Sequence, residues 1–272
     1  MTTSAAREVC LRTTRIVARI EDGIGWLTLN HPERRNALSL EMWQGLGDAV
    51  EAFSADQTVR VIVIHGAGGK SFAAGADISE FDSNRANAEQ KRHYGEISAR
   101  ASLGLSQLDK PLIAMIDGFC IGGGLAIALT ADIRIASTAA TFGIPAAKLG
   151  LGYEYEGIAA LARLIGPSYT KDLLFSARFL DSGEALRIGL INNEVAPQEL
   201  EQTVRDYAAR IVANAPLTIH AAKAAVRLYE QYTSGADSKP VARLVDHCFD
   251  SADYQEGRRA FMEKRKPKFI GQ

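Results

Sequence analysis

The chain has 272 residues, of which 47% are hydrophobic and 23% are charged, and its formal net charge is −1. These values are ordinary for a soluble globular protein with one large domain or a domain plus a small appendage. A net charge this close to zero excludes a strong overall electrostatic field that would attract nucleic acid or a membrane surface. No apolar run is long enough to span a bilayer. The three cysteines lack metal-ligand spacing, which indicates a reducing compartment, and we expect a cytoplasmic protein.

Predicted strands and helices alternate in the first part of the chain. Residues 1–15 lack an apolar signal core and are expected to form a flexible leader. Asp22-Gly23 is a strong hairpin turn signal, and Ser39 is a plausible helix N-cap. The expected elements are a hairpin over 16–29, a helix over 40–53, a strand over 61–64 and a helix over 84–108.

Residues 110–146 are the most informative stretch. An apolar, β-branched run over 112–116 predicts a buried strand, and a glycine triplet at 122–124 leads into a helical run over 125–129. Such a turn exposes backbone N–H groups at a helix start, which can bind an anion or a carbonyl oxygen that becomes anionic during a reaction. Another short strand is expected over 133–136.

The second half of the chain is mostly helical. Gly166-Pro167 is expected to end the first of these helices. The predicted helices cover 154–165, 168–177, 182–188, 198–214, 216–232, 241–249 and 253–265, with a polar loop over 233–238. Strand–helix units followed by helices indicate an α/β fold with a helical C-terminal part.

Several common chemistries find no support. The segment GAGGKS lacks the glycine that a phosphate-binding loop needs, because Ile64 stands at that position. No G-x-S-x-G is present, and the five histidines form no metal pattern. Two backbone corners remain, at residues 74–77 and 122–124. Each could simply let a strand meet a helix, but their position after successive buried strands favours a shared site.

Six segments together resemble the crotonase superfamily of enoyl-CoA hydratases and isomerases. They are KSFAAGADI, KPLIAMIDGFCIGGGL, ADIRIAS, TFGIPAAKLGL, GEALRIGLINNEV and EGRRAFMEKRKPKF. The resemblance implies a spiral of ββα units over 16–205 and a helical trimerisation part over 206–272. It also implies a homotrimer or a homohexamer built as a dimer of trimers.

The resemblance implies an acyl-CoA thioester as substrate. The near-zero net charge and the lack of a long apolar run favour neither a nucleic acid nor a membrane partner. The backbone N–H groups of Ala76 and Gly123 match the family's oxyanion hole, which stabilises an enolate. No metal or redox cofactor is implied, since coenzyme A is part of the substrate. The positions that match coenzyme A contacts are Arg34, Arg35, Ala37, Ala74, Asp77, Ile78, Phe261 and Lys264. The basic residues among them could equally be ordinary solvated surface.

The chain departs from the hydratase pattern at both acid–base positions. Ala126 and Ala146 stand where the resemblance implies glutamates, and alanine has no proton to exchange. Glu154 matches a position at which related isomerases and dehalogenases carry an aspartate, and Tyr153 matches a tyrosine of related decarboxylases. Glu154 could alternatively serve only as an acidic residue at a helix start.

The sequence therefore predicts an acyl-CoA-transforming enzyme with an oxyanion hole, nominally an enoyl-CoA hydratase/isomerase. Isomerisation, decarboxylation or hydrolysis is a better match to its residues than standard hydration. The alternative is a member of the fold that binds acyl-CoA without turning it over.

Overall fold

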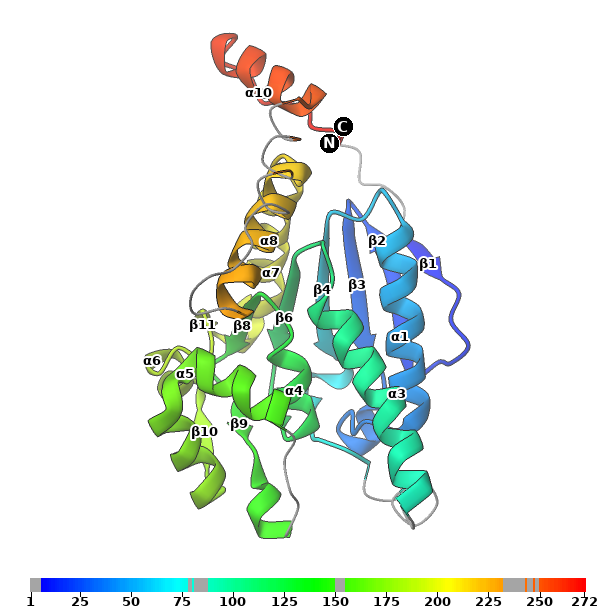
Figure 1. Ribbon diagram of the computed structural model, residues 1–272, viewed down its shortest axis with the longest axis vertical. Helices are drawn as coiled ribbons and strands as arrows, with labels where there is room; N and C mark the ends of the chain where they lie inside the picture. The colour runs from blue at the N-terminus through cyan, green and yellow to red at the C-terminus, as the bar shows by residue number, and fades with distance from the viewer. Residues whose placement is uncertain are drawn as a thin grey trace.

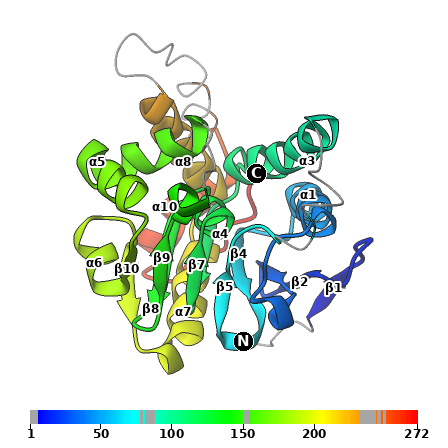
Figure 2. The same cartoon turned by 90° about the horizontal axis from the view of Figure 1, so that it is seen from below.

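Two β-sheets form the framework of the computed structural model, which describes residues 6–77, 80, 88–149, 155–231, 243, 247 and 250–272 (Figure 1). The large sheet has the strand order β1-β2-β3-β4-β6-β8-β11, and the small sheet has the order β10-β9-β7-β5. Figure 2 shows the four strands of the small sheet side by side. The strands are β1 (Arg7–Val9), β2 (Ile16–Glu21), β3 (Ile24–Leu29), β4 (Val61–Gly66), β5 (Ser71–Ala73), β6 (Leu112–Ile116), β7 (Phe119–Ile121), β8 (Ile133–Ser137), β9 (Thr141–Gly143), β10 (Phe179–Asp181) and β11 (Asn193–Val195).

Eight helices of this described part connect and cover the sheets. They are α1 (Leu40–Ala55), α3 (Ala88–Ser106), α4 (Gly123–Ala128), α5 (Tyr155–Ser176), α6 (Ser182–Arg187), α7 (Leu200–Val212), α8 (Pro216–Gln231) and α10 (Ala252–Met262). Short 3-10 turns lie at η1 (Pro32–Arg34), η2 (Ala67–Gly69), η4 (Pro145–Leu149) and η5 (Pro197–Glu199). The predicted cap of α1 is confirmed, because the Ser39 side chain accepts a hydrogen bond from the Met42 N–H at 3.2 Å. Gly166, with a φ of 78°, interrupts α5 where the sequence predicted a break.

The elements repeat as ββα units. In each unit one strand joins the large sheet and the next joins the small sheet, as in β4–β5, β6–β7 and β8–β9. Strands β4, β6 and β8 are parallel in the large sheet, and β5, β7 and β9 are parallel in the small one. Helix α3 follows the first pair and α4 the second. The predicted α/β spiral of ββα units is confirmed.

The central strands of the large sheet are buried on both faces, and their side chains alternate between two cores. Ile62 and Ile64 of β4 belong to the core that includes α1 and α3. Val61 and Val63 point to the other face and pack with residues of α7. Figure 1 shows α1 and α3 side by side on one side of the sheet.

Six three-residue strands lie where the sequence analysis predicted no strand: β1, β5, β7, β9, β10 and β11. Strand β1 lies within residues 1–15, which were expected to be a flexible leader, and it pairs antiparallel with β2. A three-residue strand is too short to show a period in the sequence, so these elements depend on their neighbours. The boundary that the sequence analysis expected between residues 205 and 206 falls inside α7. Val204 and Ala208, which lie on either side of it, pack in the same core against the large sheet. The polar loop predicted over 233–238 lies outside the described residues.

Asp56 joins β1 to the end of α1. Its carboxylate accepts hydrogen bonds from the Thr58 side chain, at 2.6 Å, and from Arg7. These bonds, that of Thr58 first, lower the pKa of Asp56 to about 2. Because the carboxyl pKa in an unfolded chain is about 4, the stabilisation is fully present above pH 4 and is lost as the pH falls through about 2.

We therefore expect Asp56→Asn to lower the free energy of unfolding by about 1 kcal/mol at pH 7, since the site is near the surface. The difference from the wild type should shrink as the pH falls from 4 towards 2. Urea unfolding at pH 7, 5 and 3 measures it. A difference that is the same at all three pH values would contradict this account of the Asp56 carboxylate.

Candidate functional site

The two glycine corners that the sequence analysis paired lie against each other. A methyl group added at Gly122 would lie 3.9 Å from the Gly75 Cα, and one added at Gly123 would lie 3.7 Å from the Ala76 nitrogen. Gly75 and Gly122 have φ values of 107° and 53°, which L side chains adopt with strain. Glycine at these positions therefore allows two loops from different ββα units to meet.

Leu38 determines the direction of the Ala76 N–H. The two residues form an isolated parallel bridge, in which Leu38 N donates to Gly75 O at 2.7 Å and Asp77 N donates to Leu38 O at 3.0 Å. In such a bridge the central residue's own N–H points away from its partner. The Ala76 N–H therefore faces away from Leu38, and no described residue accepts a hydrogen bond from it.

Gly123 supplies a second N–H at the same place. It is the first residue of α4, so its N–H has no acceptor within the helix, and none of the described residues provides one. The turn before it is held by Gly122 N, which donates to Gly143 O at 2.8 Å. Gly124 follows, where a methyl group would lie 2.2 Å from the Ala73 carbonyl oxygen. Glycine at position 124 thus lets α4 approach β5 closely enough to place Gly123 beside Ala76.

The loop before α1 is tied to the same place. Arg35 O accepts a hydrogen bond from Ala74 N at 3.0 Å. Asn36 is fully buried, and its side chain amide donates to Ala67 O at 2.9 Å and Ser71 O at 2.7 Å. The sequence indicates that Asn36 is part of a loop resembling one that meets coenzyme A, but it does not predict that the buried Asn36 side chain holds this loop. Its φ of 55° is of a kind that asparagine adopts more readily than most residues, but no single-sequence pattern shows this conformation.

The predicted coenzyme A positions near this loop are contiguous with the two N–H groups. Arg34 and Arg35 are exposed, and the guanidinium carbon of Arg35 lies 5.1 Å from the centre of the Phe119 ring. Ala37 and Ala74 are half-buried, whereas Asp77 is buried. Ile78 lies outside the described residues. The structure thus brings together five predicted positions, namely Arg34, Arg35, Ala37, Ala74 and Asp77, beside Ala76 and Gly123.

Other nucleophilic or metal chemistry has little support around the site. Cys120 precedes the glycine turn, but it is fully buried and burial raises the pKa of its thiol. It therefore stays protonated near neutral pH and is a poor nucleophile. Within the described ranges, no three or more His, Cys, Asp or Glu side chains lie close enough together to hold a metal ion. No helix in the same ranges is long and apolar enough to cross a membrane.

Comparison with known proteins assigns the family. Residues 19–272 match the model of the enoyl-CoA hydratase/isomerase family. The chain belongs to this family. It is 35% identical over 256 residues to the short-chain-enoyl-CoA hydratase of Clostridium acetobutylicum, covering 94% of this chain and 97% of that protein. It is 37% identical over 255 residues to the crotonyl-CoA hydratase of Syntrophomonas wolfei, with the same two coverages.

Solved structures agree with this assignment. An enoyl-CoA hydratase/carnithine racemase from Magnetospirillum magneticum superposes with a TM-score of 0.90 at 37% identity, covering 96% of this chain and 97% of that one. A putative enoyl-CoA hydratase/isomerase family protein from Hyphomonas neptunium gives the same TM-score and identity, covering 97% of this chain and 100% of that one. The predicted membership of the crotonase superfamily is confirmed.

The two alanines that the sequence analysis matched to acid–base positions lie close to the core. Ala126 is in α4, three residues after Gly123 and so on the same side of the helix, and it is half-buried. Ala146 lies in η4 and packs against the main core. Tyr153 and Glu154, the predicted substitutes, lie outside the described residues.

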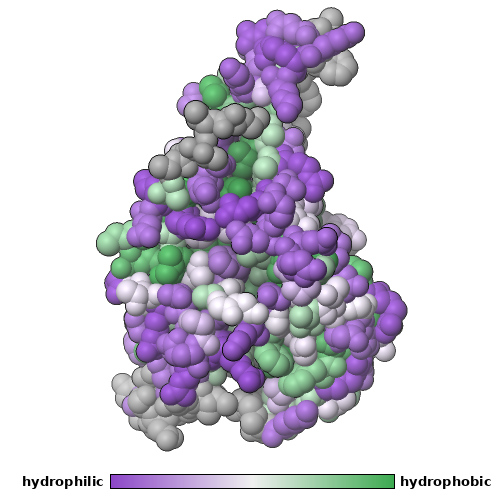
Figure 3. Space-filling view, turned by 180° about the vertical axis from the view of Figure 1, so that it is seen from behind, coloured by the Kyte–Doolittle hydropathy of each residue, from purple (hydrophilic) through white to green (hydrophobic). Residues whose placement is uncertain are grey.

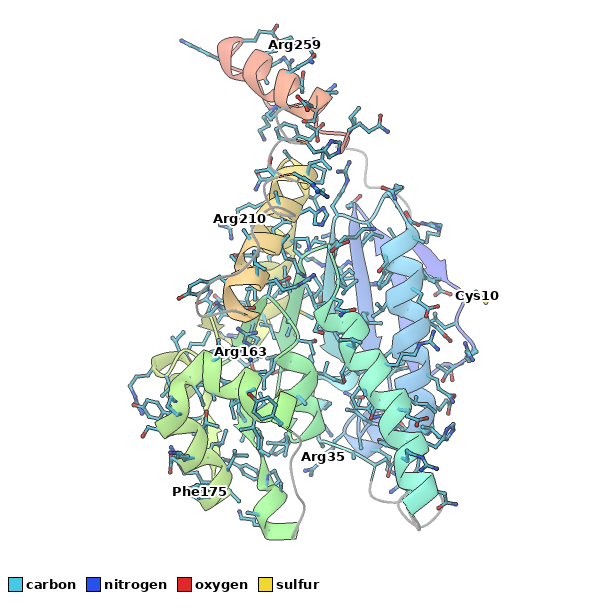
Figure 4. The ribbon with its side chains drawn as sticks, viewed as in Figure 1. Cys10, Arg35, Arg163, Phe175, Arg210 and Arg259 are labelled. Carbon is cyan, nitrogen blue, oxygen red and sulfur yellow. The ribbon has the colours of Figure 1, made fainter. Side chains whose placement is uncertain are left out.

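The C-terminal positions lie at the other end of the molecule. Phe261 is in α10 and Lys264 follows it, in an exposed turn with a φ of 53°. Arg60, just before β4, donates to Phe269 O at 3.5 Å, whereas the site follows the opposite end of β4. Figure 4 shows Arg35 and Arg259 at opposite ends of the molecule. The structure therefore does not bring Phe261 and Lys264 to the site of their own chain.

The α10 segment is held by charged side chains. Glu256 accepts hydrogen bonds from Arg265 at 2.6 Å and Arg259 at 2.5 Å, and these bonds lower the pKa of Glu256. Asp253 accepts bonds from the backbone N–H groups of Ile270 and Gly271. Figure 3 shows this end of the molecule as strongly hydrophilic. These hydrogen bonds of Glu256 and Asp253 hold the segment after α10 against the helix.

Proposed function

We propose that this crotonase-family enzyme acts on an acyl-CoA thioester whose carbonyl oxygen is bound by the N–H groups of Ala76 and Gly123. The observation that carries the proposal is the adjacency of these two N–H groups, which have no acceptor among the described residues. Fixed donors of this kind bind an enolate oxygen more strongly than a ground-state carbonyl, and each typically contributes about 10²- to 10³-fold in rate. The enzymes that the chain resembles are named for enoyl-CoA and crotonyl-CoA, which supports a CoA thioester.

The bound thioester would run along the loops that surround the two donors. In this proposal the guanidinium groups of Arg34 and Arg35 meet the coenzyme A phosphates, since both are exposed beside Ala74. The backbone around Ala37, Ala74, Asp77 and Ile78 contacts the adenine and pantetheine parts. No metal or redox cofactor takes part.

The C-terminal segment would serve a second copy of the chain. Phe261 and Lys264 lie at the end of the molecule opposite to the site, so they reach a coenzyme A only if that coenzyme A is held by another subunit. A homotrimer or a dimer of such trimers provides this arrangement. We place the assembly in the cytoplasm.

The acid–base step is proposed to use Glu154, with Tyr153 beside it. The methyl groups of Ala126 and Ala146 exchange no proton, so another group must remove or deliver one. An enolate formed at the oxyanion hole by proton removal or by loss of carbon dioxide leads to isomerisation or decarboxylation. A water activated by the same carboxylate would hydrolyse the thioester.

Replacement of Glu154 tests the catalytic role. Glu154→Gln is expected to lower turnover by about 10²-fold or more, because general acid–base catalysis contributes 10²–10⁴-fold, while leaving CoA-ester binding nearly unchanged. Turnover of a panel of acyl-CoA esters is followed by mass spectrometry and binding by calorimetry. Glu199→Gln, at an exposed position in η5, is the matched control and should leave both unchanged.

Two outcomes would contradict parts of the proposal. Undiminished turnover by Glu154→Gln would exclude Glu154 as the base. Tight binding of CoA esters by the wild type without turnover of any of them would favour the non-catalytic binder, a reading that rests on the alanines at positions 126 and 146.

A further inference from the structure

A chain of hydrogen bonds runs from α1 through α3 to the Leu38 carbonyl. Trp43 Nε1 donates to the Tyr94 hydroxyl oxygen at 2.9 Å, and this hydroxyl donates to Leu38 O at 3.2 Å. Leu38 O also accepts the Asp77 N–H at 3.0 Å. All three side chains are buried, with 6% of Trp43, 5% of Tyr94 and 0% of Leu38 exposed.

The chemistry of the three groups fixes which of them donates and which accepts in this series of hydrogen bonds. The Trp43 indole nitrogen can only donate, so the Tyr94 oxygen must accept from it. The one hydroxyl proton of Tyr94 is then directed to Leu38 O. Buried polar groups that lack partners are costly, so this arrangement favours one orientation of the Leu38 peptide.

The Leu38 peptide in turn orients the Ala76 N–H. The segment around Ala76 is joined to Leu38 by an isolated bridge, and it follows Gly75. Glycine lacks a Cβ, so its backbone has a wider conformational range than that of other residues, including the observed φ of 107°. A rotation of the Leu38 carbonyl would move the Asp77 N–H, which donates a hydrogen bond to it. The Gly75–Ala76 peptide, which carries the Ala76 N–H, would move with it. The direction of the Ala76 N–H therefore depends on how firmly Leu38 O is held.

We propose that Tyr94 is a positioning residue for the reaction. Its hydroxyl holds the Leu38 carbonyl so that the Ala76 N–H is aimed at the thioester oxygen. This inference rests on the proposed function, because it assigns Tyr94 to the same oxyanion hole. Helix α3 thereby helps set the geometry of a donor that lies on another segment. Figure 2 shows α3 next to α1, the helix that carries Trp43.

Tyr94→Phe is the direct test, because it removes the hydroxyl and keeps the ring. We expect kcat to fall about 5-fold, the equivalent of one neutral hydrogen bond, with KM changed less than about 2-fold. A loss confined to kcat marks an interaction that matters in the transition state. Tyr229→Phe, on the exposed face of α8, is the matched control and should change neither constant.

A second measurement does not depend on turnover. Hydrogen–deuterium exchange of the Asp77 amide, which is bonded to Leu38 O, should be faster in Tyr94→Phe than in the wild type and unchanged in Tyr229→Phe. If kcat is unchanged, or if KM alone rises, the positioning role is overturned. If the wild type turns over no acyl-CoA ester, the proposed function fails, and the exchange rate alone then decides whether Tyr94 fixes this loop: faster exchange supports it, and equal exchange overturns it.

Discussion

Gly123→Pro is expected to lower kcat by about 10²- to 10³-fold, which is the usual effect of removing one oxyanion-hole donor. Proline lacks the N–H that we assign to the thioester oxygen. Proline is also well tolerated at the first position of a helix, and Gly123 is the first residue of α4. Steady-state kinetics on the acyl-CoA ester that turns over fastest measures the effect.

Gly123→Ala is the matched control for this change. It keeps the N–H, and the atom nearest to the added methyl group would be Leu38 Cδ1, at 3.3 Å, which is the end of a side chain rather than backbone. We therefore expect Gly123→Ala to retain most of the activity. Equal losses in the two variants would mean that the shape of the turn, and not the N–H, is what the reaction needs.

Gly124→Ala is expected to lower the free energy of unfolding by about 3 kcal/mol, at the upper end of the range for overpacking. The added methyl group would lie 2.2 Å from the Ala73 carbonyl oxygen and 2.8 Å from the Ala73 Cβ, so β5 and α4 must separate. Urea unfolding of the two proteins at pH 7 measures the difference.

Gly47→Ala gives the opposite expectation and serves as the control. Gly47 lies inside α1, and a methyl group there would meet no atom within 4 Å other than the adjacent residues and the neighbouring backbone of its own helix. Alanine should stabilise the helix by about 0.5–1 kcal/mol, because glycine is a poor helix former. If Gly124→Ala is as stable as the wild type, the close contact between β5 and α4 is not required.

The long elements of this fold could be predicted because their patterns repeat. The helical spacing of α1 and the apolar runs of β4 and β6 are visible without a structure, and each was found within a few residues of its observed bounds. The small sheet was missed because its strands have three residues each. Strands β5, β7 and β9 each follow a strand of the large sheet, whereas β10 follows α5. All four exist because they pair with strands from other parts of the chain, which is tertiary information.

The candidate site was predictable in part for the same reason. Glycines after two successive strands predicted two neighbouring corners, and Ala76 and Gly123 do lie together. The supports of the site were not predictable. Asn36 acts through a left-handed backbone conformation, and the Tyr94 hydroxyl acts across two helices, at a separation of 56 residues from Leu38. Neither leaves a periodic signal in the sequence.

The carbonyl stretching frequency of a bound thioester tests the central claim most directly. A CoA ester labelled with carbon-13 at the thioester carbonyl is measured by infrared difference spectroscopy, free and bound, with binding established separately by calorimetry. We predict a shift to lower frequency on the wild type, because two N–H donors polarise the carbonyl, and a clearly smaller shift on Gly123→Pro. A bound thioester whose frequency equals that of the free ester, or an equal shift on the two proteins, would contradict the assignment of Ala76 and Gly123 as the oxyanion hole.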